Sequence, residues 1–95
     1  MNNRKRPPNR RSNASLRFEC EGFSYSATAG YFDDGSLSEI FLDAGKAGTA
    51  LATNANTAAI LASILLQHGV AASDIAHSVK GPISIALKMF SQEPG

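Results

Sequence analysis

The sequence contains one cysteine and no tryptophan, and it lacks any long apolar run. A single thiol, that of Cys20, excludes an internal disulfide and offers no zinc-ligand spacing. The most apolar stretch, residues 58–66, is nine residues long, about half of what a membrane-spanning helix needs. The basic residues near the start are followed by polar ones, so no secretory signal is predicted. We therefore expect a cytoplasmic protein with no membrane partner.

Charge is also scarce, and it is divided unevenly along the chain. The net charge is +1, but residues 1–17 hold six basic side chains and no acidic one, whereas residues 18–95 hold three lysines against eight acids. Residues 1–14 also carry two prolines and few apolar side chains, so they cannot bury enough surface to offset their ordering entropy. We predict a disordered basic arm there, either a solubilising tail or a contact for nucleic acid.

Three segments of the sequence alternate between apolar and polar residues. Residues 16–20, 23–31 and 38–44 each have a period of two, which is typical of half-buried strands. The segments between them, residues 21–22 and 33–36, contain glycine after an acidic residue, a pattern that supplies the positive φ of tight turns. These features predict a three-stranded antiparallel meander.

A helical period begins after residue 48. Thr49 suits the N-cap, because its hydroxyl accepts from amides of the first turn, and Gly69 suits the left-handed position after the helix end. Apolar residues at helical spacing predict which face of this helix packs on the sheet. They are Leu51, Ala58, Ile60, Leu61, Ile64 and Leu65.

This long helix carries no charged side chain from residue 49 to residue 67. A helix that lies on a sheet normally shows charge on its wet side. Small polar side chains on this side permit close approach, and alanines lie between them. The polar residues are Thr53, Asn54, Asn56, Thr57 and Ser63. We predict that a second subunit covers this face. The alternative is that the following helices fold back over it within one chain.

Two short helices complete the pattern, over residues 73–79 and 82–90, with Pro82 at a first helical position. Strands that precede helices indicate an α+β fold: a three-stranded antiparallel meander followed by one long and two short helices packed on one face. We expect this domain to span residues 15–91, with a flexible tail over residues 92–95. A single domain of this size is marginal alone, so we predict a homodimer or larger homo-oligomer. The contact is expected either at the side of the long helix that carries Asn54, Asn56 and Thr57 or at an open edge of the meander, where the first strand has no proline to block pairing.

Five segments of the folded part form a recognisable pattern: Glu39-Ile40-Phe41, the turn 45–49, the apolar helix 51–66, Gly69-Val70 and Lys80-Gly81. Together they resemble the TSCPD domain family. The resemblance implies an α+β fold. It also implies a relation to the C-terminal part of vitamin-B12-dependent ribonucleotide reductases and to small bacterial and viral proteins. Of the Thr-Ser-Cys-Pro-Asp stretch that names the family, only Pro82 remains, so the resemblance implies no metal or redox role here.

The turn between the third strand and the long helix is the candidate site. A helix N-terminus presents free amides and a partial positive charge, glycines permit close approach of an anion, and a lysine adds a full charge, an arrangement that suits a phosphate. The residues expected to hold it are Gly45, Lys46, Ala47, Gly48 and Thr49. The turn is not a Walker A motif, because Ile40 and Ala47 occupy positions where that motif needs other residues. The alternative is a plain strand-to-helix turn with a solvated lysine.

An aromatic side chain near this turn would complete a nucleotide-like site. Phe41, Phe23 and Tyr25 are the candidates for stacking on a base.

No group of residues predicts catalysis or a cofactor. His68 and His77 are nine residues apart on different helices and lack a set of metal ligands. Cys20 belongs to the core face of its strand, where a thiol is inert. Because no nucleophile, acid and base occur together, we predict a protein that is not an enzyme and holds no metal.

Three functions fit these observations. The first is a non-catalytic binding module for a phosphate-bearing, nucleotide-like molecule, either of the ribonucleotide-reductase-associated type or a viral-type sponge that sequesters a nucleotide signal. The second is a protein-interaction module that regulates a larger enzyme. The third is nucleic-acid contact through the basic arm alone.

Overall fold

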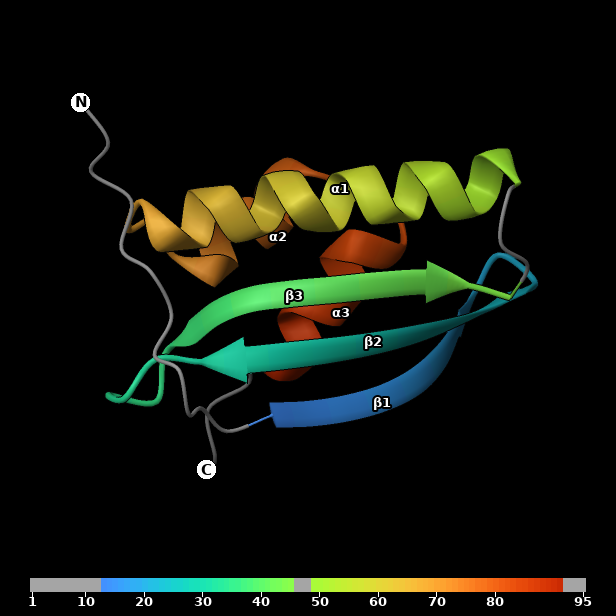
Figure 1. Cartoon of the computed structure of the whole chain (residues 1–95). Coiled ribbons are helices and arrows are strands. Elements are labelled where there is room, and N and C mark those ends of the chain that lie inside the picture. The colour runs from blue at the N-terminus through green and yellow to red at the C-terminus, as the bar shows by residue number, and fades with distance from the viewer. Residues whose placement is uncertain (1–12, 46–48, 92–95) are drawn as a thin grey trace.

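The computed structural model describes residues 13–45 and 49–91 (Figure 1). Within them three strands precede three helices, so the predicted α+β fold is confirmed. In chain order the elements are β1 (Asn13–Cys20), β2 (Phe23–Tyr31), β3 (Leu37–Ala44), α1 (Ala50–Gln67), α2 (Ala72–Ser78) and α3 (Pro82–Phe90).

The strands form the predicted meander, in the order β1-β2-β3 with antiparallel pairing throughout. Glu21 and Gly22 join β1 to β2 with φ values of 53° and 85°, as a two-residue hairpin requires. At the next turn, the Asp34 carboxylate accepts from the Ser36 amide at 2.9 Å, and Gly35 adopts a φ of 89°. Both turns therefore lie where the acidic-glycine pairs placed them.

β1 starts earlier than its alternation suggested. Asn13 and Ala14 continue the register opposite Gly30 and Ala29, so the strand includes two residues that the sequence assigned to the arm. The β1–β2 pairing is regular along its whole length, whereas a bulge between Gly30 and Tyr31 shifts the pairing of β2 with β3. The irregularity of the sheet thus lies on the side of β3.

The two faces of the sheet differ in character. The inner face, which carries Tyr25, Ala27, Ile40 and Leu42, is buried under the helices. The outer face is formed by the alternate residues of each strand and is mostly exposed. It includes the row Arg17, Ser26 and Asp43 and the row Ser15, Thr28 and Phe41.

α1 runs along β3 on the side away from β2 (Figure 1). The side chain of Ser63 bonds to both backbone groups of Ile40, at 2.9 Å from the nitrogen and 3.0 Å from the oxygen. Gln67 donates its side-chain amide to the oxygen of Ser38 at 3.1 Å. The helix therefore occupies the outer edge of β3 as a further strand would.

The predicted packing face of α1 is correct only in part. Leu51 and Ala58 pack against the core, but Ile60, Leu61 and Leu65 are about half exposed. The buried positions carry mainly small or polar side chains, and Ser63, which we expected on the wet side, is one of them. The buried positions are Ala55, Ala59, Ala62, Ser63, Leu66 and Gln67. A helix that approaches a strand edge closely has room for alanine and serine but not for a row of leucines. The small side chains of α1 do permit a close approach, but the element that they approach is β3 of the same chain.

Both ends of α1 follow the sequence signals. The hydroxyl of Thr49 accepts from the amide of Ala52 at 3.1 Å, and Gly69 has a φ of 93° after the last turn. By length and composition α1 is apolar enough to cross a membrane, with a mean hydropathy of 1.2. One third of it is buried and it bonds to β3, so we interpret it as a helix of the folded domain.

α3 covers the inner face of the sheet, behind it in Figure 1, and α2 packs against α3 and α1. α3 contacts all three strands and begins at Pro82, after Gly81 with a φ of 93°. The hydroxyl of Ser84 donates to the oxygen of Ala76 at 2.8 Å and ties α3 to α2. The radius of gyration, 12.9 Å, is that expected of one compact domain of this length.

Candidate functional site

Three chain segments meet at one end of the sheet: the β1–β2 hairpin, the end of β3 and the start of α1. Gly45 follows β3 there, and Thr49 caps α1. Lys46, Ala47 and Gly48 lie outside the described residues. The structure therefore describes Gly45 and Thr49, at the two ends of the predicted phosphate turn, and the residues around them.

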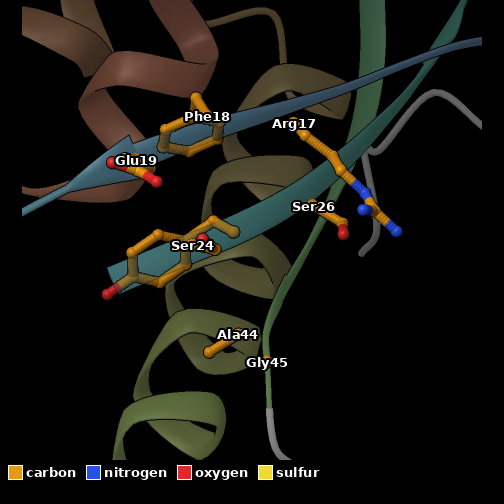
Figure 2. A pocket seen from close by; sticks show the side chains of 8 residues that line it. Arg17, Phe18, Glu19, Ser24, Ser26, Ala44 and Gly45 are labelled. Atoms are coloured by element: carbon orange, nitrogen blue, oxygen red, sulfur yellow. The ribbon is translucent and has the colours of Figure 1, made fainter. Parts of the chain in front are cut away.

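A hollow of about 500 Å³ opens beside Gly45, and we call it the polar hollow because it is the more polar of two. Its lining combines the side chains of Arg17, Glu19, Ser24 and Ser26 with Phe18, Tyr25 and Ala44. Figure 2 shows Arg17 and Ser26 extending to the same side of the sheet, as their pairing in the β1–β2 register requires. Of the residues that line the hollow, Arg17 is the one cation and Glu19 the one anion, and both are exposed.

A second hollow, of about 380 Å³, adjoins the first and is largely apolar. It is lined by Gly22, Phe23, Ser24, Gly45, Thr49 and Leu51. Ser24 and Gly45 belong to both hollows. Phe23 is 53% exposed, so part of its ring is open to a ligand.

The other two aromatic candidates lie differently. Tyr25 lines the larger hollow but is only 4% exposed, and its ring stacks on that of Phe18 with centroids 5.6 Å apart. Burial, and then the neighbouring Cys20 and Glu21, raise the pKa of the Tyr25 phenol above its ordinary value. Phe41 is exposed on the opposite face and lines neither hollow. Tyr25 and Phe41 therefore do not belong to one site, whereas Phe23 is well placed for stacking.

The described residues contain no group of three His, Cys, Asp or Glu side chains that could hold a metal ion. The Nδ1 atom of His77 lies 2.7 Å from the oxygen of Ser73. His68 is exposed after the end of α1. Cys20 is partly buried against the core, as its position in β1 predicted.

Sequence reasoning missed Arg17, Ser24 and Ser26 as site residues. A signal was present, because the alternation of β2 puts both serines on the face that also carries Arg17 of β1. Finding it requires the register of the hairpin, which the position of the Glu21-Gly22 turn supplies.

Comparison with known protein families finds the TSCPD domain over residues 4–88. The chain belongs to the TSCPD domain family. The matched segment of this TSCPD domain contains both hollows and the whole predicted turn.

Among curated proteins, the TSCPD domain is similar to a vitamin B12-dependent ribonucleotide reductase from Bradyrhizobium diazoefficiens. The two are 39% identical over 70 residues, which cover 74% of this chain and 6% of the reductase. No solved structure matches the chain. The relationship to reductases inferred from the sequence is thereby confirmed at the level of the domain.

Proposed function

We propose that this TSCPD domain is a non-catalytic binding module for a phosphate-bearing, nucleotide-like small molecule. The observation that carries the proposal is the adjacency of the two hollows. A polar one with a cation and an apolar one with an open aromatic ring meet at Ser24 and Gly45. A nucleotide has the same division into a charged and an aromatic part.

The polar hollow would take the phosphate. The guanidinium of Arg17 presents paired donors that match a phosphate, and the hydroxyls of Ser24 and Ser26 can donate further bonds. Gly45 begins the turn whose amides and Lys46 we expected to hold an anion, and this expectation is retained. The carboxylate of Glu19 opposes an anion, so affinity depends on the balance between Glu19 and Arg17.

The apolar hollow would take the base. Stacking of a base on an aromatic side chain contributes about 1–3 kcal/mol and tolerates any base. Phe23 offers such a ring, and Leu51 lies on the same hollow. Phe23 therefore replaces Phe41 and Tyr25 as the stacking residue in this proposal.

The relative's name adds support, since a ribonucleotide reductase acts on nucleotides. A module without catalysis would sense, deliver or sequester its ligand, and a cytoplasmic location gives it access to nucleotide pools. Sequestration by a viral-type sponge is one form of this proposal.

Calorimetry of the folded chain against mono-, di- and cyclic nucleotides tests the proposal. We expect at least one member to bind, and Phe23→Ala to weaken it by about fivefold or more. Phe41→Ala is the matched control, because Phe41 is exposed to the same degree as Phe23 but lines neither hollow. Equal effects of both variants, or silence across the panel from folded protein, would contradict the proposal.

A second function is favoured by the surface of α1. Ile60, Leu61 and Leu65 expose apolar area on a helix without charge, which suits contact with a larger enzyme. Co-purification with such an enzyme, lost in Leu61→Asp and kept in Phe23→Ala, would support a regulatory module. The third function, nucleic-acid contact by the basic arm, predicts binding that falls steeply with salt and disappears without residues 1–12.

A further inference from the structure

β1 provides the one open strand edge of the sheet in the described part of the chain. β2 is central, and the outer edge of β3 is occupied by Ser63 and Gln67 of α1. β1 pairs with β2 along eight residues and has no partner among the described residues on its other side. An open edge presents unpaired backbone donors and acceptors.

The pairing pattern identifies these open backbone groups. Both backbone groups of Ile40 bond to Ser63, so they point away from β2. Ile40 pairs with Ala29, whose own backbone groups must then point to β1. Alternation along the strands sends the backbone groups of Ser15, Arg17 and Glu19 to the open side of β1. The two-residue turn agrees, because it requires a bonded pair at Cys20 and Phe23.

The edge lacks the devices that keep strands apart. It has no proline and no bulge. Its exposed charges are of opposite sign, with Arg17 and Glu19 two residues apart on the same face. Such an arrangement is self-complementary, because an antiparallel copy brings each charge opposite the other sign. An edge that prevents strand pairing would instead carry charged side chains of one sign.

We propose that β1 pairs antiparallel with β1 of a second copy of this chain, about a twofold axis at Phe18. This register places Arg17 opposite Glu19 of the partner subunit, and Glu19 opposite the partner's Arg17. Phe18 faces the partner's Phe18 on the inner side, and the two meanders join into one six-stranded sheet. The contact uses Arg17 and Glu19, which also line the polar hollow, so its tests are made without ligand.

Other registers satisfy the charges less well. Only residues with outward backbone groups bond to each other, so Arg17 can face Asn13, Ser15, Arg17 or Glu19 of the partner subunit. Facing the partner's Asn13 gives no ion pair among the described residues. Facing the partner's Arg17 sets like charges directly opposite, which is destabilising. Facing the partner's Ser15 gives a longer overlap but no ion pair. The register at Phe18 is the one in which backbone and side chains are both complementary.

Hydrogen exchange of the unliganded protein tests the backbone pairing. In a monomer the amides of Arg17 and Glu19 face solvent and exchange fast, whereas the edge dimer protects both. The amide of Ser15 stays fast in this register and is protected in the other registers, where it bonds to β1 of the partner subunit. Exchange is measured at protein concentrations above and below the dissociation constant of the dimer, and light scattering determines that constant. A monomer at every concentration, or a dimer with fast Arg17 and Glu19 amides, would overturn the proposal.

Charge exchange tests the register. Arg17→Glu sets two pairs of like charges opposite each other and should weaken the dimer, as should Glu19→Arg. The double variant restores opposite charges and should restore dimerisation, which a merely structural role of either residue would not produce. Lys88→Glu, at an exposed position of α3, controls for net charge. A dimer indifferent to both single changes, or a double variant that stays weak, would overturn this register.

Discussion

The hydroxyl of Ser63 and the backbone of Ile40 exchange two hydrogen bonds, at 2.9 Å and 3.0 Å, in the buried seam between α1 and β3. One side chain thus satisfies the donor and the acceptor that a neighbouring strand would otherwise satisfy. Backbone groups buried without a partner are costly, so this pair of bonds allows a helix to cover a strand edge.

We predict that Ser63→Ala lowers the free energy of unfolding by about 1–3 kcal/mol, because it leaves the two buried backbone groups of Ile40 without a partner. Urea denaturation monitored by circular dichroism measures the loss. A change below about 0.5 kcal/mol would show that water or a shift of α1 replaces the hydroxyl.

The same chemical change at Ser38 should have the opposite or no effect. Ser38 is fully buried, and its hydroxyl has no hydrogen-bond partner in the described structure. Ser38→Ala removes a desolvated polar group and should leave the stability unchanged or raise it by about 1 kcal/mol. Measured beside Ser63→Ala in the same urea series, a comparable loss at Ser38 would refute this account.

The charges of the polar hollow should act in opposite directions on a phosphate ligand. Arg17→Gln should weaken binding of a nucleotide identified by calorimetry about tenfold, because it removes a charge-assisted contact. Glu19→Gln should strengthen binding by up to about fivefold, since it removes an exposed like charge. If both variants weaken binding, or neither affects it, the phosphate does not occupy this hollow.

Tyr25 should make stability fall at alkaline pH. Burial is the main cause of its raised pKa, so the neutral phenol is favoured in the folded state. Its contribution to stability is fully present below the unfolded-state pKa, near 10, and is lost as the pH rises through the folded-state value. Unfolding free energies measured from about pH 8 to 11 should fall less steeply in Tyr25→Phe. Equal slopes would contradict the prediction.

Local signals predicted most of the fold. The alternation of residues 23–31, the Glu21-Gly22 turn, the Thr49 cap and Gly69 all lie where sequence reasoning placed them. Each depends on backbone chemistry within a few residues, so the tertiary context did not change it.

The packing of α1 was not predictable in the same way. Apolar periodicity assumes that a helix buries its largest side chains, but α1 meets a strand edge that needs hydrogen bonds and a close approach. Ala59 and Ser63 satisfy this need, whereas Leu61 does not, and only the tertiary arrangement distinguishes them. The hollows escaped prediction for a similar reason, since Arg17 and Ser26 meet through strand register.

The covered edge of β3 also limits how far such chains can assemble. A strand-edge polymer needs two free edges on every copy, one to join the chain before it and one to join the chain after it. Because α1 covers β3, the described part of each copy has one free strand edge, that of β1. Pairing two β1 strands leaves no free edge on either copy. Under the proposed pairing, growth would stop at the pair, because Ser63 and Gln67 occupy the edge of β3 that a further strand would need.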